Sequence, residues 1–196
     1  MQIGLGRGSA VAVADLLARR RPHRADAARN FDALLVAARE AFTELGVDVS
    51  LEEIARRAGV GIATLYRNFP TREDLIESVY VAEVDAVCRF AGELAGGEPW
   101  EALVAWLRRF VTYMATKRAL VEGLNRESQA FPACRGALAE AGDPLMRRAQ
   151  AAGAARGEMD IDDVMRLFIG ITAVAYQAQD QRERVFRMAL DGIRAR

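Results

Sequence analysis

The sequence predicts an all-α protein in which a small N-terminal domain of three helices precedes a larger C-terminal helical domain. Three observations carry this prediction. Apolar residues recur at helical spacing along most of the chain, and glycine or proline interrupts that pattern at only a few points. No segment alternates apolar and polar residues in the way a strand does. The chain has 196 residues, 52% of them hydrophobic, which is enough to bury a core.

We expect three segments, namely an arm over residues 1–24, a first domain over residues 25–75 and a second domain over residues 76–196. The arm is expected to be flexible and partly basic, because a short apolar run is followed by the cluster RRRPHR. The run is too short to span a membrane, and in an export signal the positive charges precede the apolar segment. An over-long gene model before about Leu17 is an alternative explanation of the arm.

The first domain is defined by the segment VSLEEIARRAGVGIATLYRNFPTREDL, which spans residues 49–75. Ser50 and Glu53 match a capping box, which predicts a helix that begins after Ser50. Gly59 is suited to the left-handed conformation that ends such a helix.

A second short helix is expected from Ile62 to about Phe69, with Leu65 and Phe69 on its buried side. Pro70 ends it, and Thr71 caps the next helix, whose first turn carries acidic residues as the helix dipole favours. Two short helices joined by a glycine turn are typical of proteins that present a helix to the major groove of DNA.

The outward side of the second short helix carries Gly61, Thr64, Arg67 and Asn68, which cannot all be core. From residue 54 to residue 72 every charged residue is an arginine, so a local positive field is expected in a chain without net charge. An ordinary solvated, arginine-bearing face is the alternative interpretation of this pattern.

The second domain reads as a series of helices. The helix that Thr71 opens continues to about Leu94, and the next begins at Pro99. Further expected elements are a short segment near Leu120–Arg126, a helix start at Pro132, a helix from Pro144 with Asp143 as its cap to about Ala155, and helices near Asp162–Gln179 and Gln181–Ile193.

The segments AREAFTELG, EIARRAGVGIATLYRNF and REDL closely resemble the DNA-binding domain of TetR-family transcriptional regulators, over about residues 30–80. The resemblance implies that the first turn of the second short helix approaches base edges and that the TLY motif directs Thr64 and Tyr66 to DNA. It also implies that Ser50, Asn68 and Arg72 touch phosphate. The candidate DNA-binding residues are therefore Ser50, Gly61, Ile62, Ala63, Thr64, Tyr66, Arg67, Asn68 and Arg72.

Two features of these positions depart from the family pattern or limit what they can read. Asn68 stands where the family often has histidine or an aromatic residue. Ile62 and Ala63 are apolar and suit thymine methyl groups better than bidentate hydrogen bonds, so the operator sequence is poorly constrained. The basic arm that precedes the domain would enter the adjacent minor groove, or would be an unstructured tail. His23, the only histidine, lies in this arm without a partner pattern for catalysis.

In the second domain the resemblance implies a cavity for a small lipophilic effector, although the same side chains are also ordinary core residues. The candidates are Trp106, Phe110, Tyr113, Met114, Phe131, Met146, Met165, Phe168 and Tyr176. The last two helices carry wide apolar stripes that suit a two-fold homodimer on a palindromic double-stranded operator, or packing within one chain. The candidate dimer residues are Val164, Phe168, Ile171, Val174, Val185, Phe186, Ala189, Leu190 and Ile193.

The sequence contains no catalytic motif, and we expect no catalytic residue, cofactor or metal site. Cys88 and Cys134 are too few for a secreted disulfide framework and read as small buried hydrophobes, which indicates a cytoplasmic protein. The predicted function is a sequence-specific DNA-binding regulator, most simply a repressor that an effector releases. A helical small-molecule-binding or protein-interaction module without DNA affinity is the alternative.

Overall fold

The computed structural model describes residues 9–120, 123 and 130–195. Over these residues the chain forms helices joined by short turns, and no strand is present beyond one isolated bridge between Ala155 and Arg194. The helices are α1 (Ser9–Arg20), α2 (Ala25–Leu45), α3 (Leu51–Arg57), α4 (Ile62–Asn68), α5 (Arg72–Glu93), α6 (Pro99–Leu120), α7 (Ala130–Ala151), α8 (Ile161–Thr172) and α9 (Gln179–Ile193). The predicted all-α class is confirmed.

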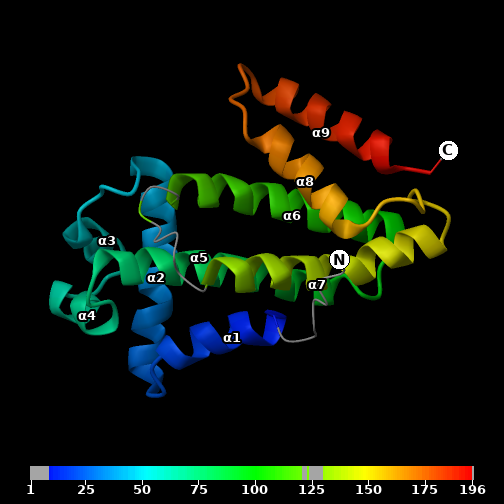
Figure 1. Cartoon of the computed structure of the whole chain (residues 1–196). Helices are drawn as coiled ribbons and strands as arrows, with labels where there is room; N and C mark the ends of the chain where they lie inside the picture. Colours follow the sequence, from blue (N-terminus) through cyan, green and yellow to red (C-terminus); the bar gives the residue numbers. More distant parts are fainter. Residues whose placement is uncertain (1–8, 121–122, 124–129, 196) are drawn as a thin grey trace.

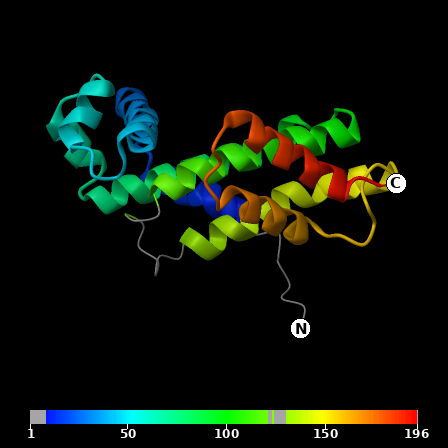
Figure 2. The same ribbon diagram turned by 90° about the horizontal axis from the view of Figure 1, so that it is seen from above.

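The molecule is elongated, with α2, α3 and α4 at one end and the remaining helices extending away from them (Figure 2). Helices α5, α6 and α7 pack on one another, while α1 and the α8–α9 pair lie on opposite sides of them (Figure 1). Helix α5 belongs to both parts, because its first turn follows α4 directly and its later turns pack against α6 and α7.

The small domain is held by the apolar faces of its helices. Phe31 and Phe42 of α2, Ile54 of α3 and Leu65 of α4 are fully buried. The ring of Phe69 lies 5.0 Å from the ring of Phe31, so the end of α4 is fixed against α2. Gly59 has a φ of +68°, which confirms the left-handed turn expected between α3 and α4.

The prediction of a flexible arm is wrong for residues 9–20, which form α1. This helix packs along α7 and α5, and Val13 is buried. Arg20 donates to the Ser78 hydroxyl at 2.9 Å, and Arg21 donates to the carboxylate of Asp32 at 2.8 and 2.6 Å. The sequence left open whether such arginines enter the minor groove or belong to an unstructured tail, and the structure has them bond to α5 and α2 instead. The first eight residues lie outside the described part of the chain.

Pro132 lies in the first turn of α7, in agreement with the helix start predicted there. Helix α7 nevertheless corrects a second prediction, since the Asp143–Pro144 step neither interrupts nor starts a helix. A proline inside a helix removes one backbone hydrogen bond, and local rules therefore predicted a break there. The loss is outweighed because α7 packs against α1, α5, α6 and α8. Its buried side is built from small residues such as Gly142, which lies under the Trp106 ring.

Helix α8 ends at Thr172, well before the predicted end at Gln179. The Thr172 hydroxyl lies 3.0 and 2.9 Å from the carbonyl oxygens of Phe168 and Ile169, and the Tyr176 hydroxyl donates to the Ile171 carbonyl at 2.5 Å. These side chains satisfy carbonyl groups that the end of a helix leaves open. The predicted segment near residues 120–126 lies mostly outside the described residues. None of the described helices combines the length and apolar character needed to cross a membrane.

Candidate functional site

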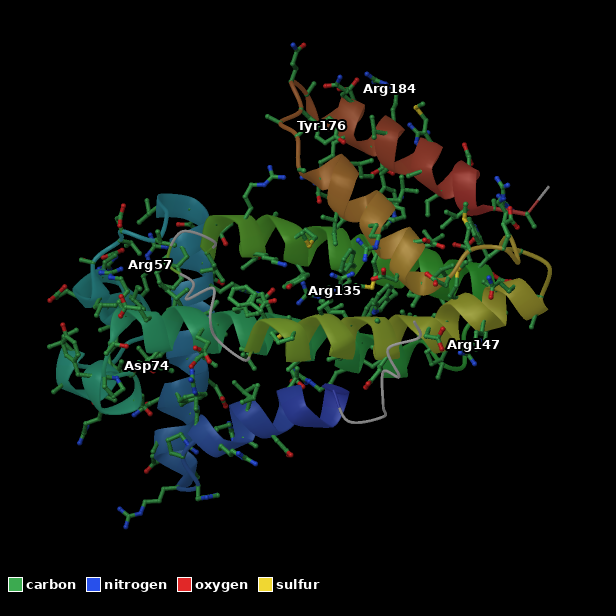
Figure 3. The ribbon with its side chains drawn as sticks, in the orientation of Figure 1. Arg57, Asp74, Arg135, Arg147, Tyr176 and Arg184 are labelled. Atoms are coloured by element: carbon green, nitrogen blue, oxygen red, sulfur yellow. The ribbon has the colours of Figure 1, made fainter. Side chains whose placement is uncertain are left out.

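Helix α3 positions the first candidate residue, Ser50, whose hydroxyl accepts a hydrogen bond from the Glu53 backbone N–H at 3.2 Å. The Glu53 side chain does not complete the expected box in the usual way, because Arg56 and Arg57 both donate to its carboxylate at 2.8 Å. These bonds lower the pKa of Glu53 to about 2. Arg57, which is labelled in Figure 3, also donates to Glu44 of α2 at 2.8 Å, and this ion pair holds α3 against α2.

This arrangement corrects the predicted positive field. The residues between 54 and 72 contain only arginines as charged groups, but acids from outside that window neutralise Arg56 and Arg57. The remaining cations of the window are Arg67, which is exposed on α4, and Arg72, which is half-buried at the start of α5. The remaining positive charge therefore covers a smaller surface than the sequence indicated, and that surface is centred on α4.

Helix α4 buries Leu65 and leaves its other flank open. Tyr66 is 48% exposed, and Gly61, Ala63 and Arg67 are exposed as well. Residues of this flank are well placed to meet a partner, because the helix is held only by its apolar side.

The polar residues of α4 form hydrogen bonds with one another. Arg67 donates to the Thr64 hydroxyl at 2.9 Å, and the Asn68 side-chain amide donates to the Thr64 carbonyl at 2.7 Å. Thr64, Asn68 and Ile62 are half-buried, and Ile62 packs against the core. The hydrogen bond between Arg67 and Thr64 thus fixes the positions of both side chains. Ile62 exposes less of its surface than a fully outward-facing residue would expose.

Arg72 has a structural role that the sequence did not reveal. It is the first residue of α5, and its guanidinium Nη1 donates to the carbonyl oxygens of Val47 and Val49, both at 2.7 Å. These bonds hold the turn that leads into α3. Thr71 caps α5, and a full capping box forms with Asp74. Hydrogen bonds from Arg72 therefore connect the turn before α3 to the first turn of α5.

A cavity of about 670 Å³ lies between α5, α6, α7 and α8. Five of the nine predicted effector residues line it, namely Phe110, Tyr113, Met114, Phe131 and Met165. Trp106, Met146 and Phe168 do not line it, and their side chains are buried elsewhere in the core between helices. The Trp106 indole N–H, for example, donates to the Val87 carbonyl at 3.3 Å. Tyr176 lines a separate hollow formed by α6 and the turn after α8.

Sequence reasoning missed several residues of this cavity. Tyr80 of α5 lines it, and so do four charged side chains, Lys117, Arg135, Asp162 and Arg166. In Figure 3 Arg135 lies between the ribbons of α6 and α7, below α8. A usable signal was present for one of them, since Lys117 is the only lysine and continues the helical spacing of Phe110, Tyr113 and Met114.

The predicted dimer residues are largely buried inside the chain. Phe168 and Phe186 face each other with ring centroids 5.1 Å apart, and Val164, Ala189, Leu190 and Ile193 are buried as well. Six of the nine candidates thus join α8 and α9 to their own chain. Ile171 and Val185 are half-buried, and Val174 is 55% exposed. The apolar side that stays open carries other residues, namely Leu167, Ile169 and Met188, the last of which is 70% exposed.

Two family descriptions match this chain. Residues 34–79 match the bacterial regulatory proteins of the tetR family, and residues 98–195 match the C-terminal domain described as transcriptional regulator SbtR-like. The first match covers the later part of α2, then α3, α4 and the first turns of α5, and the second covers α6 to α9.

Two solved structures are similar over nearly their full length. A TetR transcriptional regulator from Streptomyces coelicolor is 39% identical, with 84% of this chain and 98% of that chain covered and a TM-score of 0.76. A TetR transcription regulatory protein from Mycobacterium vanbaalenii is 35% identical, with 89% and 100% covered and a TM-score of 0.73. Together with the helix-turn-helix of α3 and α4, these matches establish that the chain belongs to the TetR family of transcriptional regulators.

Proposed function

We propose that this protein is a homodimeric repressor that binds a palindromic operator and is released by a small lipophilic molecule held between α5, α6, α7 and α8. One observation carries the proposal: α4 is held by Leu65 and the adjoining Phe69, while the flank with Tyr66 and Arg67 is open to a partner. In a helix-turn-helix, this is the side of the second helix that enters the major groove.

We assign the DNA-binding role of each candidate residue from its position on or beside α4. Gly61, Ala63 and Thr64 occupy the first turn of α4 or its cap, where backbone and short side chains approach base edges most closely. Tyr66 and Arg67 supply phosphate contacts, and Ser50 and Asn68 flank them. Ile62 contributes an apolar contact to a thymine methyl group. Arg72 acts chiefly by holding the turn before α3, and its charge adds to the local field.

Dimerisation is proposed through the open side of α8 and α9. Leu167, Val174 and Met188 are exposed apolar residues there, and a Cβ atom built on Gly170 or Gly192 would meet nothing within 4 Å. Such a surface suits a two-fold contact between two copies, which places two α4 helices about 34 Å apart for successive major grooves. Met188→Asp is expected to give monomers in sedimentation analysis, whereas Val36→Asp, at an exposed apolar residue of α2, is not.

Release requires that the cavity and α4 be linked. Tyr80 lines the cavity and lies on α5, about 12 Å along the helix axis from Arg72, as the rise of an α-helix dictates. On the same helix Glu83 is buried and lies 3.5 Å from Arg39 of α2 and 3.7 Å from Arg109 of α6. A ligand that favours another position of α5 would change the spacing of the two α4 helices and so lower the affinity for the operator.

The test is binding of a labelled duplex from the region upstream of the protein's own gene, measured by fluorescence anisotropy over a range of salt. Tyr66→Ala is expected to weaken binding about tenfold, as the loss of one hydrogen bond to a charged phosphate would. Arg72→Ala is expected to weaken binding to all sequences and to flatten the salt slope by about one unit, whereas Arg72→Lys should retain the slope.

The matched control is Arg147→Ala, which removes an exposed arginine on α7 far from α4 (Figure 3). It is expected to leave binding unchanged. If Tyr66→Ala and Arg72→Ala bind like the parent, the site assignment is wrong. If the parent shows no salt-dependent binding to duplex DNA, the alternative of a helical module without DNA affinity is supported instead.

A further inference from the structure

The cavity between α5 and α8 has an uneven distribution of charge. Its walls are mainly apolar and aromatic, but Lys117, Arg135 and Arg166 line it together with a single acid, Asp162. The chain as a whole carries no net charge, with 27 basic and 27 acidic residues. A local excess of two positive charges at this cavity is therefore a property of the site and not of the composition.

Two of these cations share the one acid. Arg135 of α7 donates to Oδ1 of Asp162 at 2.9 Å, and Arg166 donates to Oδ2 of the same carboxylate at 2.6 Å. The bonds lower the pKa of Asp162, so that its carboxylate stays ionised between the two guanidinium groups. The cluster bridges α7 and α8 beside the cavity and retains one positive charge.

Lys117 is the other cation and is placed differently. Its ammonium is half-buried and lies 5.9 Å from the centre of the Tyr80 ring, and no carboxylate in the described part of the chain forms an ion pair with it. The Phe131 ring packs against the same tyrosine in a tilted arrangement, with ring centroids 5.1 Å apart. Burial lowers the pKa of Lys117, as expected for an ammonium that has lost part of its hydration.

An ammonium beside aromatic rings gains some cation–π stabilisation, but it recovers only part of the hydration energy that it loses. A ligand anion would compensate the remainder, whereas a neutral ligand would bury the charge further and a cationic ligand would be repelled. The volume of about 670 Å³ accommodates a molecule of ordinary ligand size.

We propose that the cavity recognises a small amphipathic carboxylate, whose anionic group pairs with Lys117 and whose apolar body packs on Tyr80, Phe131 and Met165. The Arg135–Asp162–Arg166 cluster closes the charged side of the site and adds to the attraction of the anion. This inference rests on the proposed function only in taking the same cavity as the effector site.

The experiment uses the full-length protein and matched pairs of acids and their primary amides, namely phenylacetate, 1-naphthaleneacetate and decanoate with the corresponding amides. Thermal unfolding and calorimetric titration report binding. At least one acid is expected to bind about tenfold more tightly than its amide, which is the effect of one charge-assisted contact.

Lys117→Met keeps an unbranched side chain in place and removes the charge, and it is expected to reduce that preference to within about twofold, since the anion loses its partner. Lys117→Arg should retain the preference. Arg118→Met is the matched control, because it removes one positive charge from the next, exposed residue of α6 and should leave the preference intact. The melting temperature of each ligand-free variant verifies folding.

The proposal is overturned if the amides bind as tightly as the acids, if the preference survives in Lys117→Met, or if no acid of the panel binds. Operator binding by the ligand-free protein is measured separately. If an acid binds through Lys117 but does not release the duplex, the carboxylate site stands and the proposed mechanism of release fails.

Discussion

The helix-turn-helix end of the molecule is stabilised mainly by interactions between residues close together in the sequence, whereas the C-terminal bundle is stabilised mainly by contacts between helices far apart in the sequence. Helices α3 and α4 are short and are defined by neighbours along the chain, such as the Ser50 cap, the Glu53–Arg57 pair and the turn at Gly59. In the bundle, α7 continues through Pro144 because contacts with distant helices outweigh the local signal. Local rules are therefore reliable at the DNA-binding end and unreliable where burial of long helices dominates.

This contrast predicts that the two parts respond differently to the same core substitution. Leu65 in α4 and Leu103 in α6 are both fully buried. Leu65→Ala is expected to destabilise the small domain by about 2–5 kcal/mol and to abolish DNA binding while the bundle still unfolds cooperatively. Leu103→Ala should instead lower the unfolding temperature of the bundle. Unfolding of both variants in a single, identical transition would show that the two parts form one cooperative unit.

A smaller effect is expected at Gly142 of α7. Replacing a helical glycine by alanine usually stabilises a helix, but a Cβ here would lie 2.6 Å from Cη2 of Trp106 and 2.9 Å from Cγ1 of Ile161. Gly142→Ala is therefore expected to cost about 1–3 kcal/mol in chemical denaturation. Gly92→Ala on α5, with nothing within 4 Å, is the control and should be neutral or stabilising. Stabilisation by Gly142→Ala would contradict the close packing of α6 on α7.

Ser50→Ala tests whether the small domain is stabilised by short-range interactions. Loss of the hydrogen bond from the Glu53 N–H to the Ser50 hydroxyl is expected to cost about 1 kcal/mol, seen as faster hydrogen exchange in α3 and α4. Thr43→Ala serves as control, because the Thr43 hydroxyl bonds within α2 and caps no helix. Equal acceleration of exchange in α6 and α7 would show that the cap is coupled to the bundle.

The smallest expected effect concerns pH. The folded-state pKa of Glu53 is about 2, below its ordinary value of 4.5, so its contribution to stability is present above pH 4.5 and is lost as the pH falls toward 2. The difference in melting temperature between the parent and Glu53→Gln should therefore shrink over that interval. Glu52→Gln, at the exposed neighbouring position, is the control. A difference that stays constant to pH 2 would mean that Glu53 acts by packing alone.

Much of the site at the DNA-binding end could be predicted from the sequence, because its residues follow short-range patterns. Thr64 and Arg67 lie on the flank of α4 that helical spacing assigned to them, and Tyr66, which the family resemblance added, is exposed as well. The role of Arg72 could not be predicted, since its acceptors Val47 and Val49 are more than twenty residues away along the chain. The pairing of Arg57 with Glu44, 13 residues away, was missed because it joins two different helices.

The sequence by itself determined the helical class, the start and end of the helix-turn-helix and the residues of its outward flank. These features depend on caps, turns and periodicity within a few residues. The tertiary structure alone decided that residues 9–20 form a packed helix, that α7 is continuous, and which aromatic residues line a cavity. It also decided which side of α8 and α9 is buried. In each of these cases the outcome depends on which distant surface covers a side chain, and periodicity identifies an apolar face without identifying its partner.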